Sequence, residues 1–284
     1  MPIDDTNMNW LRKWILLLPF CAAQPLLAQL EVVHSREVQS VFSGPARSIE
    51  VIFRNPGTSG TNVSVRTRMY QVSSSTAAPF GKSDPWKTLQ VLSSQTVLES
   101  GTFNFPEVKS MTRFLIQWID DAAGVIGKTE VFVFPTNLLT ELHPLAKGLP
   151  VGVYDPENHL KPLLKAYALD VEDLADTKAE KFSGNLAIVW SPIHLSSKSS
   201  ELKRKVAILA KADKAVVWIV PDQEPGAMTE PRMLPVQAVN GTVVIVQSSL
   251  VSDFQLNPQS QLNLLRAVGL ATMPEQLHFS ENNR

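Results

Sequence analysis

Three residues in the second half of the chain could form a hydrolytic site: Asp155, His194 and Ser248. A serine hydroxyl becomes nucleophilic when a histidine takes its proton and a carboxylate orients that histidine. All three follow apolar runs typical of strands, and open α/β sheets bind ligands at the carboxyl ends of their strands. Nothing in the spacing selects this set, because Ser248 is not on a Gly-x-Ser-x-Gly elbow and Asp155 precedes Pro156 as a helix-capping residue would. We therefore predict no catalytic residue and keep the three as candidates for an alternative, a hydrolase or a small-ligand binder. The same strand ends also carry Glu157, Ser191, Asp222, Glu224 and Gln247.

A metal or cofactor site is not predicted either. Asp155, His159 and His194 could ligate a metal only if the fold brought them together, and the five histidines include no His-x-x-x-His pair. Gly152 stands alone, so no glycine-rich phosphate loop is present in the sequence. We expect no cofactor and no metal.

The N-terminal segment, residues 1–28, has the three parts of an export signal. Arg12 and Lys13 precede an apolar run, and small residues follow it at Ala23 and Ala28. We expect cleavage after Ala28, with Ala23 as the second choice; initiation at Met1 or at Met8 stays open. An uncleaved anchor is disfavoured because the run is short and broken by prolines and a glutamine. Lipid attachment at Cys21 is disfavoured by the bulky residue before it.

Cys21 is the only cysteine of the 284-residue chain, so the mature protein carries no thiol and no disulfide. A cysteine nucleophile and a thiolate metal site are therefore excluded. The net charge of −1 gives no electrostatic case for nucleic acid. After cleavage no membrane span is expected, and we expect a periplasmic or extracellular bacterial protein of two domains.

Residues 29–134 are predicted to form an all-β sandwich, because apolar and polar residues alternate in short runs separated by turn residues. In the run 49–54, Ile49, Val51 and Phe53 share one face. Arg66 and Arg68 are expected on an outer face, solvated or meeting an acidic partner. Residues 73–85 are predicted to be a long loop suited to variable contacts.

This half resembles an immunoglobulin-like domain of bacterial exported proteins. The residues that carry the resemblance are Arg54-Asn55-Pro56-Gly57, Ser100-Gly101-Thr102-Phe103 and the closing pair 114–119 and 128–134. The cysteine pair of antibody domains is absent. The resemblance implies a spacer or binding module.

After a linker over residues 135–149, residues 150–284 are predicted to form a three-layer α/β domain with a mostly parallel sheet. The strands, at 151–154, 186–190, 215–220 and 242–246, are continuous apolar runs, as in a sheet covered on both faces. Helices are expected to begin at Pro156, with Asp155 as the cap, within Ser196–Ser200, and at Asn257-Pro258. The last is expected to end at Gly269, with Leu262, Leu265 and Val268 inward. The proline-rich segment 221–235 is predicted to be irregular.

The domain resembles the class I glutamine-amidotransferase-like fold, a flavodoxin-like sandwich, in residues 149–156, 185–192 and 205–221. The active family has a cysteine on a Gly-x-Cys-x-Gly elbow, with a later His and Glu. Here Pro221-Asp222-Gln223 follows the strand, and His278 and Glu281 have the wrong spacing. The resemblance thus implies a degenerate site, and we expect a non-catalytic exported protein with a protein partner in the cell envelope.

Overall fold

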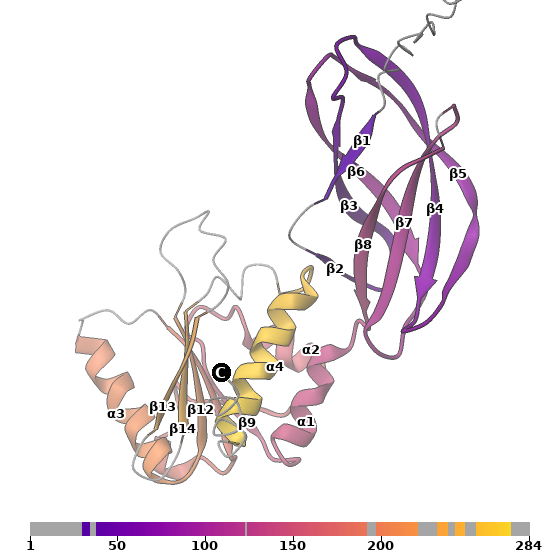
Figure 1. The fold of residues 1–284 in the computed structure, drawn as a ribbon. Coiled ribbons are helices and arrows are strands. Elements are labelled where there is room, and N and C mark those ends of the chain that lie inside the picture. Colours follow the sequence, from indigo (N-terminus) through magenta and orange to yellow (C-terminus); the bar gives the residue numbers. More distant parts are fainter. Residues whose placement is uncertain are drawn as a thin grey trace, which may run out of the picture.

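The computed structural model describes residues 30–34, 38–122, 124–191, 197–220, 232–237, 242–247 and 254–273. The predicted export signal, His194 and Ser248 lie outside these residues. The described part forms an N-terminal β-sandwich and a C-terminal α/β domain, which confirms the predicted fold class (Figure 1). None of the described helices is long and apolar enough to cross a membrane.

The sandwich consists of two facing sheets. One has the order β1–β3–β6 and the other the order β2–β8–β7–β4–β5. All neighbours are antiparallel except β2 and β8, which are parallel. The strand bounds are β1 Glu31–Val33, β2 Gln39–Phe42, β3 Gly44–Arg54, β4 Thr61–Val72, β5 Ala77–Val91, β6 Thr96–Phe105, β7 Thr112–Asp120 and β8 Gly124–Phe134.

The core of the sandwich follows the period of two seen in the sequence. Ile49, Val51 and Phe53 of β3 are buried between the sheets, as predicted. Trp118 of β7 lies at the centre, with its ring centroid 5.5 Å from that of Phe53. Its indole nitrogen donates to Thr129 Oγ1 at 2.8 Å, so the large side chain is buried without losing its hydrogen bond.

The prediction of a long loop at residues 73–85 is wrong. A short turn joins Ser73 to Thr76, whose carbonyl accepts from Ser73 N at 2.8 Å, and β5 begins at Ala77. β5 pairs along β4 with two register shifts and lies at the edge of its sheet. Most side chains of β5 are exposed, so its sequence can be polar. The backbone hydrogen bonds to β4 do not require apolar side chains, so a polar sequence still forms this strand.

The α/β domain has a six-stranded sheet in the order β10–β9–β11–β12–β14–β13. Five strands are parallel, and β13 pairs antiparallel with β14 at one edge. The elements are η1 Leu138–Glu141, α1 Leu142–Leu145, β9 Val151–Tyr154, α2 Lys161–Ala166, β10 Val171–Asp173, η2 Ala179–Lys181, β11 Leu186–Trp190, α3 Ser197–Lys211, β12 Ala215–Val220, β13 Arg232–Gln237, β14 Thr242–Gln247 and α4 Pro258–Thr272.

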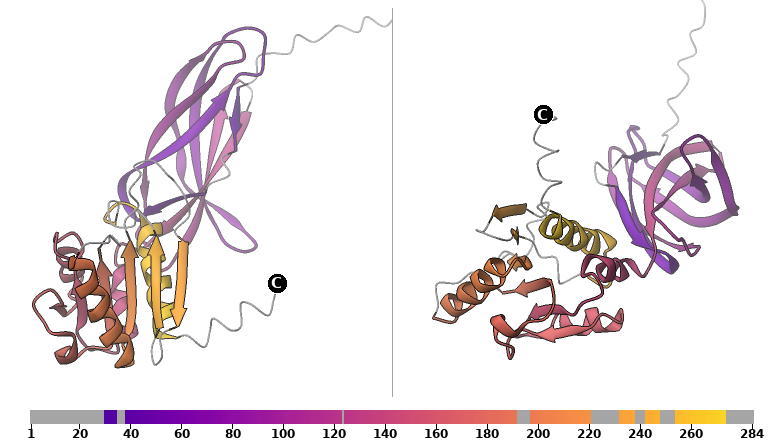
Figure 2. Two further views of the ribbon diagram at one scale, coloured as in Figure 1. Left: turned by 90° about the vertical axis from the view of Figure 1, so that its left-hand side faces the viewer. Right: turned by 90° about the horizontal axis from the view of Figure 1, so that it is seen from below.

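Helices cover both faces of this sheet, which is why its strands are apolar throughout. Along β11, Leu186 and Ile188 are buried in one core together with residues of α1, α2 and α4. Ala187 and Val189 are buried in the other core together with residues of α3 and η2. Figures 1 and 2 show α3 on one side of the strands and α4 with α1 on the other.

Residues 135–149, which we expect from the sequence to link the domains, contain η1 and α1. Leu139, Leu142 and Ala146 are buried in the same core as α4. Tyr167 after α2 donates its hydroxyl to Thr136 O at 3.1 Å. Most of this segment therefore packs as part of the α/β domain.

Three details of the predicted helices and loops differ from the structure. The helix expected to begin at Pro156 begins at Lys161, because the residues between them form a turn. Gly269 does not end α4, which continues to Thr272. In the segment 221–235, residues from Arg232 onward form β13; Pro235 is tolerated there because β13 is an edge strand.

The inward face of α4 was only partly predicted. Val268 is buried as expected, whereas Leu262 and Leu265 are half-buried. Gln261, Asn263 and Leu264 are the buried residues of that turn. Gln261 Nε2 donates to Phe254 O at 2.8 Å, which allows a polar side chain to lie on the apolar face.

Candidate functional site

The carboxyl ends of β9 and β11 form the place where a ligand site is expected in this sheet. The two strands are neighbours, and the chain leaves β9 toward β10 on one side and β11 toward β12 on the other. Such a switch point leaves a crevice at the strand ends in open α/β sheets. The described residues at this point are Tyr154 and Asp155 at the end of β9, and Trp190 and Ser191 at the end of β11.

Asp155, the first of the predicted candidates, is fully buried. Its Oδ2 accepts from the backbone N–H groups of Leu160 at 2.7 Å and Lys161 at 3.0 Å. These are N–H groups at the start of α2, which have no partner within the helix. Asp155 Oδ1 is buried without a hydrogen-bond partner among the described residues. The carboxylate thus closes the β9–α2 turn in the way a helix-capping residue does.

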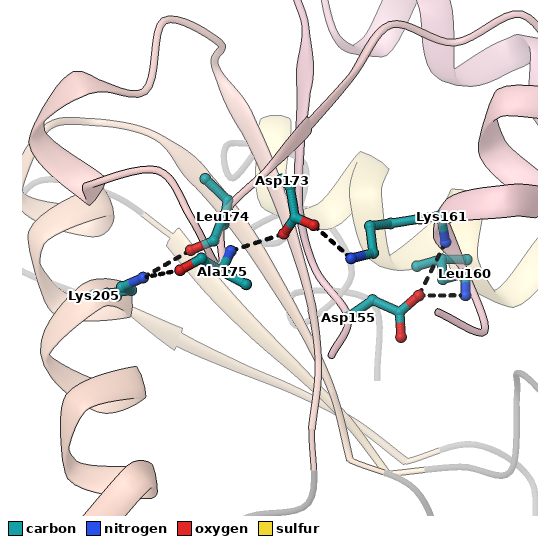
Figure 3. Close-up of polar contacts among 7 residues, drawn as sticks. All are labelled: Asp155, Leu160, Lys161, Asp173, Leu174, Ala175 and Lys205. Atoms are coloured by element: carbon teal, nitrogen blue, oxygen red, sulfur yellow. Dashed lines mark hydrogen bonds and ion pairs between the residues drawn. The ribbon is translucent and has the colours of Figure 1, made fainter. Parts of the chain in front are cut away.

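Lys161 and Asp173 form an ion pair beside Asp155 (Figure 3). Lys161 Nζ lies 2.5 Å from Asp173 Oδ2, and Ala175 N donates to Asp173 Oδ1 at 2.8 Å. Partial burial raises the pKa of Asp173, but the hydrogen bonds from Lys161 and Ala175, with the charges of Lys161 and Lys165, lower the pKa more, so it lies below its usual value of 3.8. Asp173 is therefore ionised and held in place at neutral pH.

Lys205 of α3 extends this network to the other layer of the domain. Its Nζ donates to the carbonyl oxygens of Leu174 at 2.8 Å and Ala175 at 3.2 Å (Figure 3). The loop after β10 is thereby tied to α3 on one side and, through Asp173 and Lys161, to α2 on the other. Lys161, Asp173 and Lys205 are thus bound to the protein's own groups.

A second group of side chains at the switch point is more open. His159 Nε2 lies 3.0 Å from Glu157 Oε2, and the His159 ring lies against Trp190 with centroids 4.4 Å apart. The side chains of His159 and Glu157 are 50% and 72% exposed. A carboxylate that orients an imidazole is the arrangement of a general base, and the aromatic face beside it could support a planar or apolar ligand.

The structure places only one of the three predicted catalytic candidates. Asp155 is at the strand end as expected, while His194 and Ser248 lie outside the described residues, so their convergence with Asp155 stays a prediction. Among the described residues no group of three or more His, Cys, Asp or Glu side chains could hold a metal ion.

Sequence reasoning missed Lys161, Asp173 and Lys205. Lys161 begins α2 and Asp173 ends β10, so the helix and a turn separate them in the chain, and Lys205 reaches carbonyl oxygens rather than a side chain. The sequence feature that marks them is the short run Val171–Asp173. This strand has three residues, two of them acidic, so it does not appear as a continuous apolar run.

Two hollows in the described structure differ in size and place. One lies beneath α3 near Tyr154 and Lys205 and has a volume of about 10 Å³, room for about one water molecule. The other lies in the sandwich, has a volume of about 290 Å³, and is lined by residues of both sheets, among them Glu50 and Lys128, and by Val38 between β1 and β2. The first is too small for a substrate.

The replacement Asp173→Asn is expected to lower the free energy of unfolding at neutral pH but not in acid. Because its folded-state pKa is lowered, the ionised Asp173 stabilises the fold fully above 3.8, and this contribution is lost as the pH falls through the folded pKa. The loss at pH 7 should be below about 1 kcal/mol, since the side chain is partly solvated. Urea unfolding of both proteins from about pH 7 to about pH 2.5 measures it. The exposed Asp170→Asn is the control and should show no such pH dependence; a difference that persists unchanged in acid would contradict the assignment.

No family model matches this chain, and no curated protein matches it. The solved structures that are similar to part of this chain include parts of three longer chains: alkylpurine DNA glycosylase AlkC of Pseudomonas fluorescens, a β-glucosidase of Listeria innocua and a β-D-glucoside glucohydrolase of Trichoderma reesei. The identities are 11%, 12% and 11%, and the TM-scores 0.28, 0.29 and 0.26. The matches cover 37%, 38% and 38% of this chain but only 30%, 16% and 19% of those chains, so they are distant likenesses between parts of proteins.

Proposed function

We propose that this is a non-catalytic exported protein that takes part in a complex of the bacterial cell envelope. In this proposal the sandwich is an immunoglobulin-like spacer or binding module. The α/β domain is a degenerate amidotransferase-like unit that serves as an interaction or ligand-sensing element. Residues 1–28 direct export and are removed.

The absence of a thiol supports the degenerate assignment. Cys21, the only cysteine, lies in the proposed signal, and β12 is followed in the sequence by Pro221-Asp222-Gln223. An amidotransferase of this class needs a cysteine thiolate to attack the amide carbon. No residue of the mature chain supplies that nucleophile.

The observation that carries the proposal is that charged side chains near the carboxyl ends of β9 and β10 bind other groups of the protein itself. Asp155 binds two backbone N–H groups, Lys161 binds Asp173, and Lys205 binds two carbonyl oxygens. A general acid or base must be able to reach the proton that it transfers. Groups held by their own fold in this way stabilise the domain and are not aimed at a substrate.

Export is tested by the mature N-terminus. We expect the protein recovered from the envelope fraction of its native cells to begin at Gln29, since cleavage follows Ala28. Intact-mass measurement of the purified protein checks this, and replacement of Ala28 by a bulky residue should block processing. Recovery of the unprocessed chain from the cytosol would contradict the proposal.

The non-catalytic role is tested with the mature protein, residues 29–284. It should show no turnover of amide or ester substrates, and chemical cross-linking in intact cells should join it to an envelope protein. Turnover that disappears in the variant His159→Ala would overturn the proposal. Cross-linking that yields no protein partner would overturn the assignment to a complex.

A second function, hydrolysis or small-ligand binding at the strand ends, is favoured by one observation. His159 is oriented by Glu157 and lies against Trp190 beside the carboxyl end of β11. This arrangement has a base, an orienting carboxylate and an apolar face in one place. The His159→Ala comparison above separates the two proposals, because a structural His159 would affect stability and not turnover.

A further inference from the structure

The connection between the two domains is short. β8 ends at Phe134 and η1 begins at Leu138, so only residues 135–137 join the sandwich to the α/β domain. Phe134 is buried, and Leu139, at the start of η1, is buried in the core that contains α4. Flexible linkers are typically rich in glycine and serine, and none of these connecting residues is either.

Each of the connecting residues is also restrained. The ring of Pro135 fixes its φ angle. The carbonyl oxygen of Thr136 accepts a hydrogen bond from the Tyr167 hydroxyl at 3.1 Å. The carbonyl oxygen of Asn137 accepts from the backbone N–H of Thr140 at 3.0 Å and from its hydroxyl at 2.6 Å. The chain therefore has little freedom to rotate between the two domains.

Tyr167 ties this connection to two helices of the α/β domain. It is the C-terminal cap of α2, and its hydroxyl oxygen accepts from Gln261 Nε2 of α4 at 3.4 Å. Gln261 is buried, and its Nε2 also donates to Phe254 O. The Tyr167 hydroxyl thus joins Thr136 to α4, the helix that contacts β2 of the sandwich.

The sandwich contributes two aromatic side chains on this side. Phe42 of β2 and Phe134 of β8 are paired in register. The preceding residues, Val41 and Val133, pack in the sandwich core, and successive residues of a strand face opposite ways, so both rings face the outside of the five-stranded sheet. They are nevertheless only 4% and 5% exposed. The outer face is thus covered at this end of the sheet, and Figure 1 shows one end of α4 beside β2.

The backbone around these rings is held in place as well. Ser43 N donates to Phe134 O at 2.8 Å, which ties the end of β2 to the end of β8. Arg47 donates through Nε to Phe42 O at 2.9 Å and through Nη2 to Ser43 O at 2.7 Å. The part of the sandwich that α4 contacts is therefore fixed to its neighbouring strands.

We propose that these contacts form a rigid joint that holds the two domains in one orientation, with the Tyr167 hydroxyl as its latch. Domains of one chain move relative to each other by default, unless their contacts prevent it. Here the restrained connection, the two covered rings and the latch do so together. The inference rests on the proposed role of the sandwich as a spacer and states that this spacer is rigid. A partner bound to one domain then meets the other in a set position.

The joint is tested by the distance between two spin labels, one on each domain. Residues 29–284 contain no cysteine, so Lys82→Cys/Lys178→Cys places labels only at these two exposed positions. Double electron–electron resonance should give one narrow distance distribution for the mature protein. Adding Phe42→Ala and Tyr167→Phe should broaden the distribution by about twofold or more, because both the covered ring and the hydroxyl latch are lost. Tyr167→Phe alone should give an intermediate width.

The matched control is Leu115→Ala/Tyr154→Phe. Leu115 is half-buried on the same outer face of the five-stranded sheet, and Tyr154 is a half-buried tyrosine of the α/β domain, so similar groups are lost away from the joint. This variant should keep the narrow distribution. Circular dichroism checks that each labelled variant is folded.

Three results would contradict the joint. A broad or multiple distribution in the unmodified joint would show that the domains move freely, and this holds even if a variant does not fold. An unchanged width in the joint variants would show that these contacts do not set the orientation. Equal broadening in the control would indicate general loosening of the domains. The label distances do not depend on export, turnover or a partner, so the proposed function stands or falls separately.

Discussion

Replacement of Gly184 by alanine is expected to lower the free energy of unfolding of the α/β domain by about 3 kcal/mol or more. A Cβ atom at Gly184 would overlap the carbonyl oxygen of Pro150 and lie 2.8 Å from Cε2 of Phe182. Pro150 directly precedes β9, and Gly184 lies just before β11, its neighbour in the sheet. A backbone oxygen cannot turn aside as a side chain can, so the two strands would have to separate at their amino ends.

Hydrogen exchange of the β9 and β11 amides, together with urea unfolding, measures this effect. The matched control is Gly269→Ala in α4, where a Cβ would meet nothing within 4 Å. Alanine inside a helix is favoured over glycine, so this variant should be more stable by about 0.5–1 kcal/mol. If Gly184→Ala were as stable as the wild type, this result would contradict the close contact of Gly184 with the carbonyl oxygen of Pro150.

Replacement of Asn55 by alanine is expected to destabilise the sandwich by about 2–4 kcal/mol. The side chain is fully buried, and Nδ2 donates to Ser59 O at 2.8 Å and to Val91 O and Leu92 O at 3.2 Å. Oδ1 accepts from Gly57 N at 2.9 Å. One amide thus joins the turn after β3 to the end of β5, and alanine would remove all four hydrogen bonds, including the buried one to Val91 O.

Asn62→Ala is the control for this prediction, because Asn62 is exposed on β4, and it should change stability by less than about 0.5 kcal/mol. Asn55→Asp has nearly the same shape but loses the donors and adds a buried charge, so at neutral pH it should be at least as damaging as alanine. Thermal unfolding followed by tryptophan fluorescence compares the three variants. A mild effect of both Asn55 variants would show that the turn is held by other contacts.

The sequence predicted those elements whose burial dictates their composition. The strands β9, β11, β12 and β14 are covered on both faces, so each is an apolar run that can be recognised in the sequence. β5 and β13 are edge strands with exposed or proline-containing sequences, and only pairing with β4 and β14 makes them strands. Such pairing depends on residues far away in the chain, so a local pattern cannot reveal it.

The candidate site was predictable only in part for a related reason. Asp155 could be named because it follows a recognisable strand and precedes a proline. Lys161 and Asp173 could not be paired, since their approach depends on β10 lying beside β9 in parallel register. The contact of His159 with Trp190 depends in the same way on the order of β9 and β11. Residue types at strand ends were visible in the sequence, but their partners were not.

The position of α4 in the chain has a consequence for the order of folding during synthesis. All partners of the sandwich strands lie within residues 30–134, so this domain can close as soon as that segment is free. On one face of the parallel sheet, η1, α1 and α2 share a core with Leu264, Ala267 and Val268 of α4, which are made much later. Until then the part of this face over β12 and β14, which α4 contacts, presents hydrocarbon to water. A nascent chain halted before Pro258 would therefore display a finished first domain and an aggregation-prone second one, the kind of client that a holding chaperone recognises.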